Sequence, residues 1–215
     1  MSKHVINLIK FGENQTLDFK HSITDSKKIA RSLVAFANTE GGTLLIGVKD
    51  NGSIVGVDSE EEYYMVEAAA QMFCKPEIHF DVTKWVINAK TVLEVVVKPS
   101  SKRPHKAPDK NGDYKAFIRI NDENMVATPI QLKIWKADRN RKSIRLTLTE
   151  KENILFDYLK INQKITVGQY SRIAFMSRID AENTLIKLTV LGLICYTASL
   201  DEEYFSINNG FEEEI

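Results

Sequence analysis

The chain has 215 residues, 43% of them hydrophobic, and its 29 basic and 29 acidic side chains give a formal net charge of zero. This length suits one large domain or two modest ones, and the hydrophobic content excludes wholesale disorder. No apolar run reaches about 18 residues, so we expect no membrane association. We also expect neither a secretory segment, because the first residues contain no long apolar stretch, nor a zinc site, because the Cys and His residues lack zinc-ligand spacing. We therefore expect a cytoplasmic protein with two free thiols, Cys74 and Cys195.

The first 136 residues predict alternating strands and helices. We expect a strand at 13–20, followed by a helix that Asp25 or Ser26 caps and Gly41-Gly42 ends. Strands at 43–48 and 53–57 should flank an Asp50-Asn51-Gly52 turn, and a helix at 60–72 should follow them. The last predicted elements of this part are strands at 78–82, 85–89 and 92–97, a polar loop at 99–113, a strand at 114–120 and a short helix from Pro129.

The remaining residues are organised differently. A basic stretch at 137–146 predicts a linker. Thr149 and Glu152 form a capping-box pattern before a helix, a second helix is expected at 166–174, and Ser177 can cap a third that Gly192 ends. Two short apolar strands then flank an acidic turn. The sequence thus predicts an α+β fold in which an α/β domain (1–136) and a linker (137–146) precede a small winged helix-turn-helix domain (147–215).

Four ordered sequence blocks closely resemble the Schlafen AlbA-like domain over roughly residues 8–130. They are Glu13-x4-Asp18-Phe19-Lys20, Ala35-Phe36-Ala37-Asn38-Thr39-Glu40-Gly41-Gly42, the apolar strand leading to Asp50, and Lys102-Arg103-Pro104-His105 with Phe117-Ile118-Arg119-Ile120. Asp18 stands where the family more often has Glu, and Asn121-Asp122 stands where it has a Gly-Ser pair. The resemblance implies a divergent Alba-type fold that binds DNA.

Basic residues are concentrated in one stretch of the chain. Residues 98–145 hold 13 Lys and Arg against 5 Asp and Glu, which leaves 16 basic and 24 acidic residues elsewhere. Such a cluster is typical of a phosphate-binding surface, although a solubilising loop has the same composition. The predicted phosphate contacts are Lys98, Lys102, Arg103, His105, Lys106, Lys110, Lys115 and Arg119. Arg119 has the alternative interpretation of a structural ion-pair partner.

The turn formed by Asn38, Thr39, Gly41 and Gly42 is a candidate anion site. Backbone N–H groups between a helix and a strand can receive a phosphate. The alternative is that the two glycines only permit a tight turn. No Gly-Lys-Ser/Thr follows them, so this is not a Walker loop.

Three carboxylates support an enzymatic alternative. Some Schlafen relatives are RNA endonucleases, and the resemblance places Glu13, Asp18 and Asp50 at their acidic positions. Convergent carboxylates could hold Mg²⁺ or Mn²⁺ and activate water for phosphodiester hydrolysis. The alternative is that Glu13 and Asp18 pair with cations such as Lys20 and that Asp50 starts a turn. Outside this alternative we expect no cofactor and no metal.

The third helix of the second domain is the expected recognition helix. Its polar residues Arg178, Asn183, Thr184 and Lys187 are of the types that contact base edges and phosphates in the major groove. A protein-interaction role is the alternative for this domain.

The sequence therefore predicts a nucleic-acid-binding protein, with double-stranded DNA as the expected partner, that acts as a transcriptional regulator. A homodimer would match the symmetry of a duplex. The alternatives are the metal-dependent endoribonuclease and a nucleotide-binding or protein-interaction module. We expect no enzymatic activity other than the ribonuclease alternative.

Overall fold

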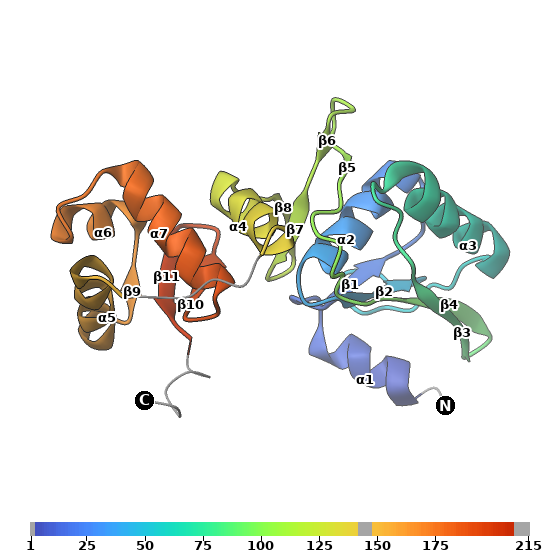
Figure 1. The fold of residues 1–215 in the computed structure, drawn as a ribbon. Helices are drawn as coiled ribbons and strands as arrows, with labels where there is room; N and C mark the ends of the chain where they lie inside the picture. Colours follow the sequence, from blue (N-terminus) through green and yellow to red (C-terminus); the bar gives the residue numbers. More distant parts are fainter. Residues whose placement is uncertain (1–2, 142–147, 209–215) are drawn as a thin grey trace. The chain divides into compact units, whose positions relative to one another are not determined.

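A computed structural model describes residues 3–141 and 148–208 (Figure 1). The chain divides into two compact units, Met1–Ala127 and Thr128–Ile215. Within the described residues, no helix is long and apolar enough to span a membrane. Helices and sheets are mixed throughout, which confirms the predicted α+β class.

A four-stranded sheet forms the centre of the first unit, in the order β1-β2-β4-β3. β1 (Leu17–Lys20) runs parallel to β2 (Gly42–Ile46), whereas β4 (Lys90–Val97) is antiparallel to both β2 and β3 (Asp81–Ile87). Because side chains alternate along a strand, Leu44 and Ile46 enter one apolar core and Leu45 enters the other.

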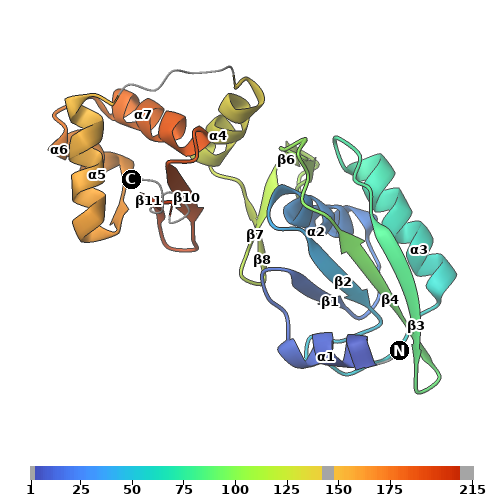
Figure 2. The same cartoon turned by 60° about the horizontal axis from the view of Figure 1, so that its bottom comes forward.

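One face of this sheet is covered by α2 (Ser26–Asn38) and α3 (Ser59–Ala68), which a π-helical turn, η1 (Ala69–Phe73), continues (Figure 2). Asp25 caps α2, its carboxylate accepting from the backbone N–H of Lys27 at 2.8 Å. Almost every side chain of α2 from Ile29 onward is buried, so this helix is the centre of the larger core.

The opposite face is covered by α1 (Lys3–Phe11), a helix that was not among the predicted elements. Its Val5 is fully buried against Leu17, Phe19 and Leu45. At its start, His4 lies 2.8 Å from the buried carboxylate of Glu94 on β4, which also accepts from the indole N–H of Trp85. Tertiary contacts thus hold this nine-residue helix, which is too short to be stable alone.

Two short hairpins follow β4. β5 (Ala107–Pro108) pairs with β6 (Tyr114–Lys115), and β7 (Phe117–Ile120) pairs with β8 (Glu123–Val126), which packs with β7 against α2. β8 was not expected. The strands expected at 78–82 and 85–89 are instead the single strand β3, and the one expected at 53–57 makes only an isolated bridge between Val48 and Ile54. Lys84 does not interrupt β3 because this edge strand leaves it exposed.

In residues 128–141 and 148–208, the second unit has four helices and a three-stranded antiparallel sheet, β10-β11-β9. Its elements are α4 (Pro129–Arg139), α5 (Glu150–Asn162), β9 (Lys164–Ile165), α6 (Val167–Ile173), α7 (Arg178–Val190), β10 (Ile194–Ala198) and β11 (Glu203–Ile207). Thr149, Thr166 and Ser177 cap α5, α6 and α7, and the fully buried Tyr170 and Phe205 lie in the core.

The helix α4 belongs to the second unit. It packs against α7, and Lys133 pairs with Glu182 of that helix. The sequence had placed this helix in the first domain and a linker at 137–146. Residues 137–139 are the last residues of α4, and 142–147 lie outside the described residues. The helix extends beyond Trp135 because nothing in the following polar residues breaks it before its C-cap, Asn140.

Candidate nucleic-acid interface

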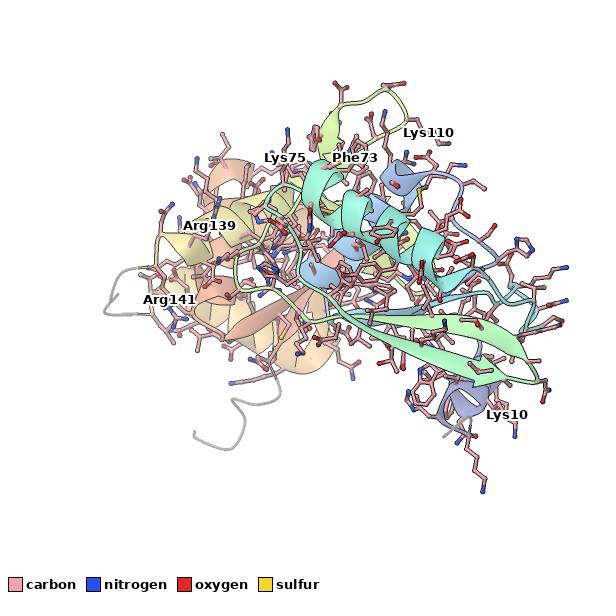
Figure 3. The ribbon with its side chains drawn as sticks, turned by 90° about the vertical axis from the view of Figure 1, so that its right-hand side faces the viewer. Lys10, Phe73, Lys75, Lys110, Arg139 and Arg141 are labelled. Atoms are coloured by element: carbon pink, nitrogen blue, oxygen red, sulfur yellow. The ribbon has the colours of Figure 1, made fainter. Side chains whose placement is uncertain are left out.

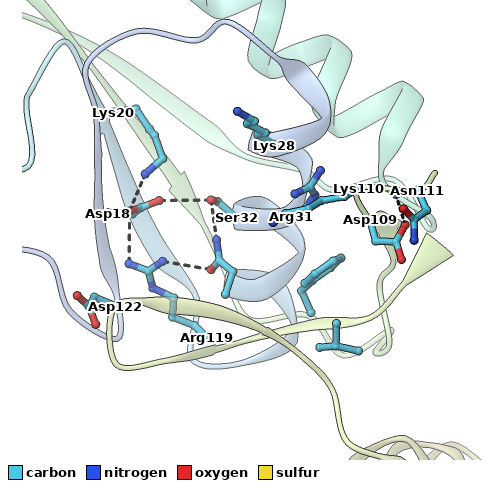
Figure 4. Close-up of a pocket in the computed structure, with 13 residues that line it drawn as sticks. Asp18, Lys20, Lys28, Arg31, Ser32, Asp109, Lys110, Asn111, Arg119 and Asp122 are labelled. Atoms are coloured by element: carbon cyan, nitrogen blue, oxygen red, sulfur yellow. Dashed lines mark hydrogen bonds and ion pairs between the residues drawn. The ribbon is translucent and has the colours of Figure 1, made fainter. Parts of the chain in front are cut away.

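A pocket of about 640 Å³ opens beside α2 in the first unit (Figure 4). Its lining comes from β1, α2, the loop between β5 and β6, and the β7–β8 hairpin. The residues are Asp18, Lys20, Lys28, Arg31, Ser32, Asp109, Lys110, Asn111, Phe117, Arg119, Asp122, Asn124 and Val126. Five of them are basic and three are acidic.

A buried polar network forms the inner wall of this pocket. Lys20 Nζ and Arg119 Nη2 lie 2.9 and 3.4 Å from Asp18 Oδ1. Ser32 Oγ donates to Asp18 Oδ2 at 3.3 Å and accepts from Asn124 Nδ2 at 3.0 Å. Arg119 Nη1 donates to Asn124 Oδ1 at 3.1 Å, which closes the ring of contacts. The negative charge of Asp18 is therefore neutralised by two cations, and its carboxylate holds the residues of the inner wall together.

The carboxyl groups of Glu13 and Asp18 lie beside each other. Burial raises the pKa of Glu13, and its hydrogen bond with Asp18 acts in the same direction. Burial also opposes ionisation of Asp18, but the hydrogen bond from Glu13 and the positive charges of Lys20 and Arg119 outweigh it and lower the pKa of this carboxyl. Glu13 Oε1 additionally accepts from the backbone N–H of Phe19 at 2.8 Å.

The carboxylate trio of the enzymatic alternative does not assemble. Glu13 and Asp18 are neighbours, whereas Asp50 is exposed in the turn after β2. Across residues 3–141 and 148–208, no group of three or more His, Cys, Asp or Glu side chains is arranged to hold a metal ion. The ion pairs of Asp18 with Lys20 and Arg119 match the structural interpretation of this residue instead.

The outer wall of the pocket carries the cations Lys28, Arg31 and Lys110 together with the acidic residues Asp109 and Asp122. Lys28 and Lys110 are exposed, and in the described part of the chain neither side chain has a hydrogen-bond or ion-pair partner. Arg31 is half-buried, and its Nε donates to the carbonyl of Pro108 at 2.9 Å. Figure 4 shows Arg31 and Lys110 approaching each other from α2 and from the loop after β5. The arrangement can bind an anion.

Of these cations, the sequence analysis named Lys110 and Arg119 as phosphate contacts and Lys20 as a partner of the carboxylates, but it did not name Lys28 or Arg31. The signal was available in part, because residues at positions i and i+3 share a helix face and Lys28 and Arg31 have this spacing. Nothing in the sequence pairs that face with a loop some 80 residues later.

The Asn38–Gly42 turn is occupied by structural hydrogen bonds. The side chain of Asn38 is buried and bonds the backbone of His105 and Phe117. The backbone N–H groups of Thr39 and Gly41 both donate to the carbonyl of Phe36. A Cβ on Gly42 would lie 2.3 Å from the Phe36 ring, and Gly41 has a φ of +81°. This geometry matches the tight-turn interpretation, in which the N–H groups are not directed at a ligand.

The predicted basic contacts divide into exposed and buried residues. Lys98, Lys102, Lys106, Lys110 and Lys115 are exposed, and Lys98 pairs with Asp81 at 2.9 Å. Figure 3 shows Lys110 on the loop that joins β5 and β6. Arg103 is half-buried.

His105 and Arg119 lie inside the first unit, each 3% exposed. Both ring nitrogens of His105 have partners, the carbonyl of Pro76 at 2.9 Å and Ser100 Oγ at 2.7 Å. Burial lowers the pKa of His105, and the positive charge of Lys102 adds to this effect. His105 and Arg119 are therefore buried structural residues, and the exposed part of the basic surface consists of the lysines.

In the second unit, Arg178, Asn183 and Lys187 are exposed on α7, and Thr184 is half-buried. Ser177 Oγ accepts from the backbone N–H of Asp180 at 3.1 Å and orders the start of the helix. The turn before it exposes Phe175, whose side chain is 93% accessible. These polar residues lie on one unit, and those of the pocket lie on the other.

Two solved structures of bacterial proteins are similar to this chain. The DIP2311 protein of Corynebacterium diphtheriae is 18% identical, with a TM-score of 0.42 over 60% of this chain and 29% of its own. The N-terminal domain of a Nitrosomonas europaea protein described as related to the ATP-dependent DNA helicase RecG is 16% identical, with a TM-score of 0.35 over 68% of this chain and 94% of its own. This chain thus spans less than a third of the first of these proteins.

The family model described as Schlafen, AlbA_2 matches residues 13–128. The match covers more than half of the chain, and all of it except residue 128 lies within the first unit, residues 1–127. It confirms the resemblance that the four sequence blocks carried. The chain belongs to the Schlafen AlbA_2 family.

Proposed function

We propose that this protein binds nucleic acid and that the first unit holds the phosphate backbone. The observation that carries the proposal is the pocket beside α2, which collects Lys20, Lys28, Arg31, Lys110 and Arg119 from four separate segments of the chain. Lys20 and Arg119 are committed to Asp18, whereas Lys28 and Lys110 remain available for an anion. Family membership supports the same proposal.

The exposed lysines of the 98–115 segment extend this surface. Lys102, Lys106 and Lys115 are exposed and belong to the same unit as the pocket. Contacts of this kind go to phosphates, so they contribute affinity without sequence preference. The proposed partner is double-stranded DNA, and the proposed role is transcriptional regulation in the cytoplasm.

The second unit is proposed to be a winged helix-turn-helix that adds affinity or sequence choice. The order α5-β9-α6-α7 and the β10–β11 hairpin support this assignment. Arg178, Asn183, Thr184 and Lys187 would then approach the major groove from α7. Two binding modules on one chain raise the effective concentration of the second after the first has bound. A homodimer is part of the proposal.

A salt titration tests the phosphate contacts. The affinity of the full chain for a labelled duplex is measured by fluorescence anisotropy from 50 to 300 mM KCl. Each phosphate contact contributes about 0.9 to the slope of log affinity against log salt. The double variant Lys28→Gln/Lys110→Gln should bind more weakly and lower that slope by about 1–2. Lys10→Gln, an exposed lysine on α1, is the matched control and should leave the slope unchanged.

The outcome that contradicts the proposal is equally specific. If the native chain binds neither DNA nor RNA at 50 mM salt, the protein is not a nucleic-acid binder. If the native chain binds DNA and the double variant Lys28→Gln/Lys110→Gln has the same salt slope as the native chain, the phosphates are bound outside this pocket. Arg178→Gln and Lys187→Gln test the second unit separately, and a changed preference among duplex sequences would support its proposed role.

A further inference from the structure

We propose that the pocket beside α2 binds the phosphomonoester group of a nucleotide, either at the end of a nucleic-acid strand or on a free mononucleotide. The inference rests on the proposed function and specifies the ligand of the pocket. An extended basic face would accept any internal phosphodiester of a duplex. This site is concave instead and is closed on one side by the buried wall of Asp18, Ser32 and Arg119.

The dimensions of the pocket fit one nucleotide unit. Its volume of about 640 Å³ lies within the range of small-ligand pockets, roughly 300–1,000 Å³. A duplex can reach the exposed Lys28 and Lys110 at the mouth of the pocket but is too wide to enter it, whereas a chain end can enter. The accessible part of the site therefore selects a terminal or free nucleotide by shape.

The charge of the lining matches a doubly charged anion. Its five cations exceed its three carboxylates by two. Asp18 already pairs with Lys20 and Arg119. Asp109 Oδ1 accepts from the backbone N–H groups of Asn111 at 2.8 Å and Asp113 at 3.0 Å, so this carboxylate shapes the loop that carries Lys110. A phosphomonoester carries close to two negative charges at pH 7, whereas an internal phosphodiester carries one.

Arg31 is held in a position suited to phosphate. Its Nε donates to the carbonyl of Pro108, next to the loop that presents Lys110. One edge of the planar guanidinium is thereby anchored, and no hydrogen bond or ion pair to any described residue uses the two terminal nitrogens. A guanidinium binds phosphate oxygens through two parallel hydrogen bonds, and fixing it beforehand reduces the ordering that binding requires.

The β7–β8 side of the pocket suits the rest of a nucleotide. Val126 is 53% exposed and provides an apolar surface against which a base or sugar can pack. Asp122 is exposed on the turn of the same hairpin and can accept from a sugar hydroxyl or an exocyclic amine. The lining thus combines cations for phosphate with an apolar surface and an acceptor, as a nucleotide requires.

The experiment compares single-stranded ten-mers that differ only at one end. The 5′ end, or in a second series the 3′ end, carries a hydroxyl, a phosphate or a phosphate methyl ester, and the opposite end carries the fluorophore. At pH 7.5 the phosphorylated oligomer should bind the full chain about tenfold more tightly than the hydroxyl oligomer in at least one series, as expected for added charge-assisted hydrogen bonds. The methyl ester, which has a single charge, should lose most of that gain.

The pH dependence separates a phosphomonoester from a phosphodiester. The second phosphate ionisation occurs near pH 6, so the preference for the phosphorylated oligomer should decrease between pH 7.5 and pH 5. The titratable groups that face the site are Asp18, Asp109, Asp122, the lysines and, beside Asp18, Glu13; histidine is absent from its lining. A change contributed by Glu13 would appear equally with the methyl ester, which is therefore the internal control.

Variants and a competitor complete the test. Lys28→Gln/Lys110→Gln and the charge-preserving Arg31→Lys should reduce the preference to about threefold or less, because they remove charge and the planar fork respectively. Lys10→Gln should keep it. A nucleoside monophosphate that displaces the oligomer at micromolar concentration identifies a free nucleotide as the ligand. Displacement only by a phosphorylated oligomer identifies a strand end, and both outcomes support the site.

Equal binding of all three oligomers in both series, with equal losses in the variants, would overturn this inference and leave general phosphate binding intact. Absence of binding to any oligomer and to duplex DNA would overturn the proposed function and this inference together. Stronger binding of the phosphorylated oligomer that Lys28→Gln/Lys110→Gln leaves unchanged would place its recognition outside this pocket and would also overturn it.

Discussion

The guanidinium of Arg119 lies 3.4 Å from the carboxylate of Asp18, and each residue is only 3% exposed. The two residues are 101 positions apart in sequence and join β1 to β7. Arg119 also donates to the backbone carbonyls of Asn14 and Leu17 and lies over the Phe36 ring. This arginine, which the sequence suggested as a phosphate contact, ties the β7–β8 hairpin to the sheet.

Replacement of Arg119 should therefore destabilise the first unit. Arg119→Met leaves Asp18 buried with only Lys20 as a cationic partner, and removal of one member of a buried pair costs about 3–5 kcal/mol. The free energy of unfolding is measured by urea denaturation with Trp85 fluorescence in a Trp135→Phe background. Lys115→Met, at an exposed position on β6, should change it by less than about 0.5 kcal/mol. A loss of DNA affinity with unchanged stability would instead mean that Arg119 contacts the ligand.

Asn38 should be required for the loop that follows β4. Its amide donates to the carbonyls of His105 and Phe117 at 2.9 and 2.8 Å, and its oxygen accepts from the His105 N–H at 2.8 Å. Asn38→Ala leaves three buried backbone groups without partners, so we expect a loss of about 2–4 kcal/mol in the same denaturation measurement. Asn111→Ala, in the exposed loop before β6, is the control. Unchanged stability in Asn38→Ala would favour a direct ligand role for the turn.

Acidification should lower the free energy of unfolding of the first unit, because His105 becomes protonated. Its pKa is lowered in the folded protein, mainly by burial, so the unfolded chain binds the proton more readily. The stabilisation by neutral His105 is complete above the unfolded pKa, near 6.5, and is lost as the pH falls toward the folded value. The slope cannot exceed about 1.4 kcal/mol per pH unit. The difference in unfolding free energy between pH 7.5 and 5.5 should shrink in His105→Gln and persist in His79→Gln, an exposed control.

The two glycines at positions 42 and 168 should respond oppositely to alanine. A Cβ at Gly42 would lie 2.3 Å from the Phe36 ring in the core, and overpacking of this kind typically costs about 1–3 kcal/mol. A Cβ at Gly168, in α6, meets no atom within 4 Å. Alanine there favours the helix by up to about 1 kcal/mol. Thermal unfolding of the two variants checks both signs, and a tolerated Gly42→Ala would show that Phe36 can move aside.

Several helices of both units could be predicted because the sequence signals that begin and end them are local. The apolar spacing from Ile29 to Ala37, the cap at Asp25 and the Gly41-Gly42 stop together indicate α2, and the structure has it at Ser26–Asn38. The capping box at Thr149 and the cap at Ser177 likewise begin α5 and α7. Each of these signals depends on residues within four positions of one another.

Other parts of the fold depend on distant partners and gave no such signal. The helix α1 is held by the burial of Val5 and by the contact of His4 with Glu94, 90 residues away. The strand β8 is short and exposed along much of its length, so it shows neither an apolar run nor a clear alternation. Its pairing with β7 and its packing against α2 place it.

The sequence by itself determined the family, the mixed fold and the presence of a basic segment, because ordered motif blocks and charge are properties of the chain. Only the tertiary structure decided which cations are available. Arg119 is turned inward to Asp18, His105 is enclosed by Pro76 and Ser100, and Lys28 and Arg31 of α2 are brought to Lys110. Whether a charged side chain faces solvent or a buried partner is set by packing between segments that are distant in sequence. The separation is 101 residues for Arg119 and Asp18, and 79 residues for Lys110 and Arg31, and a local sequence pattern cannot predict such packing.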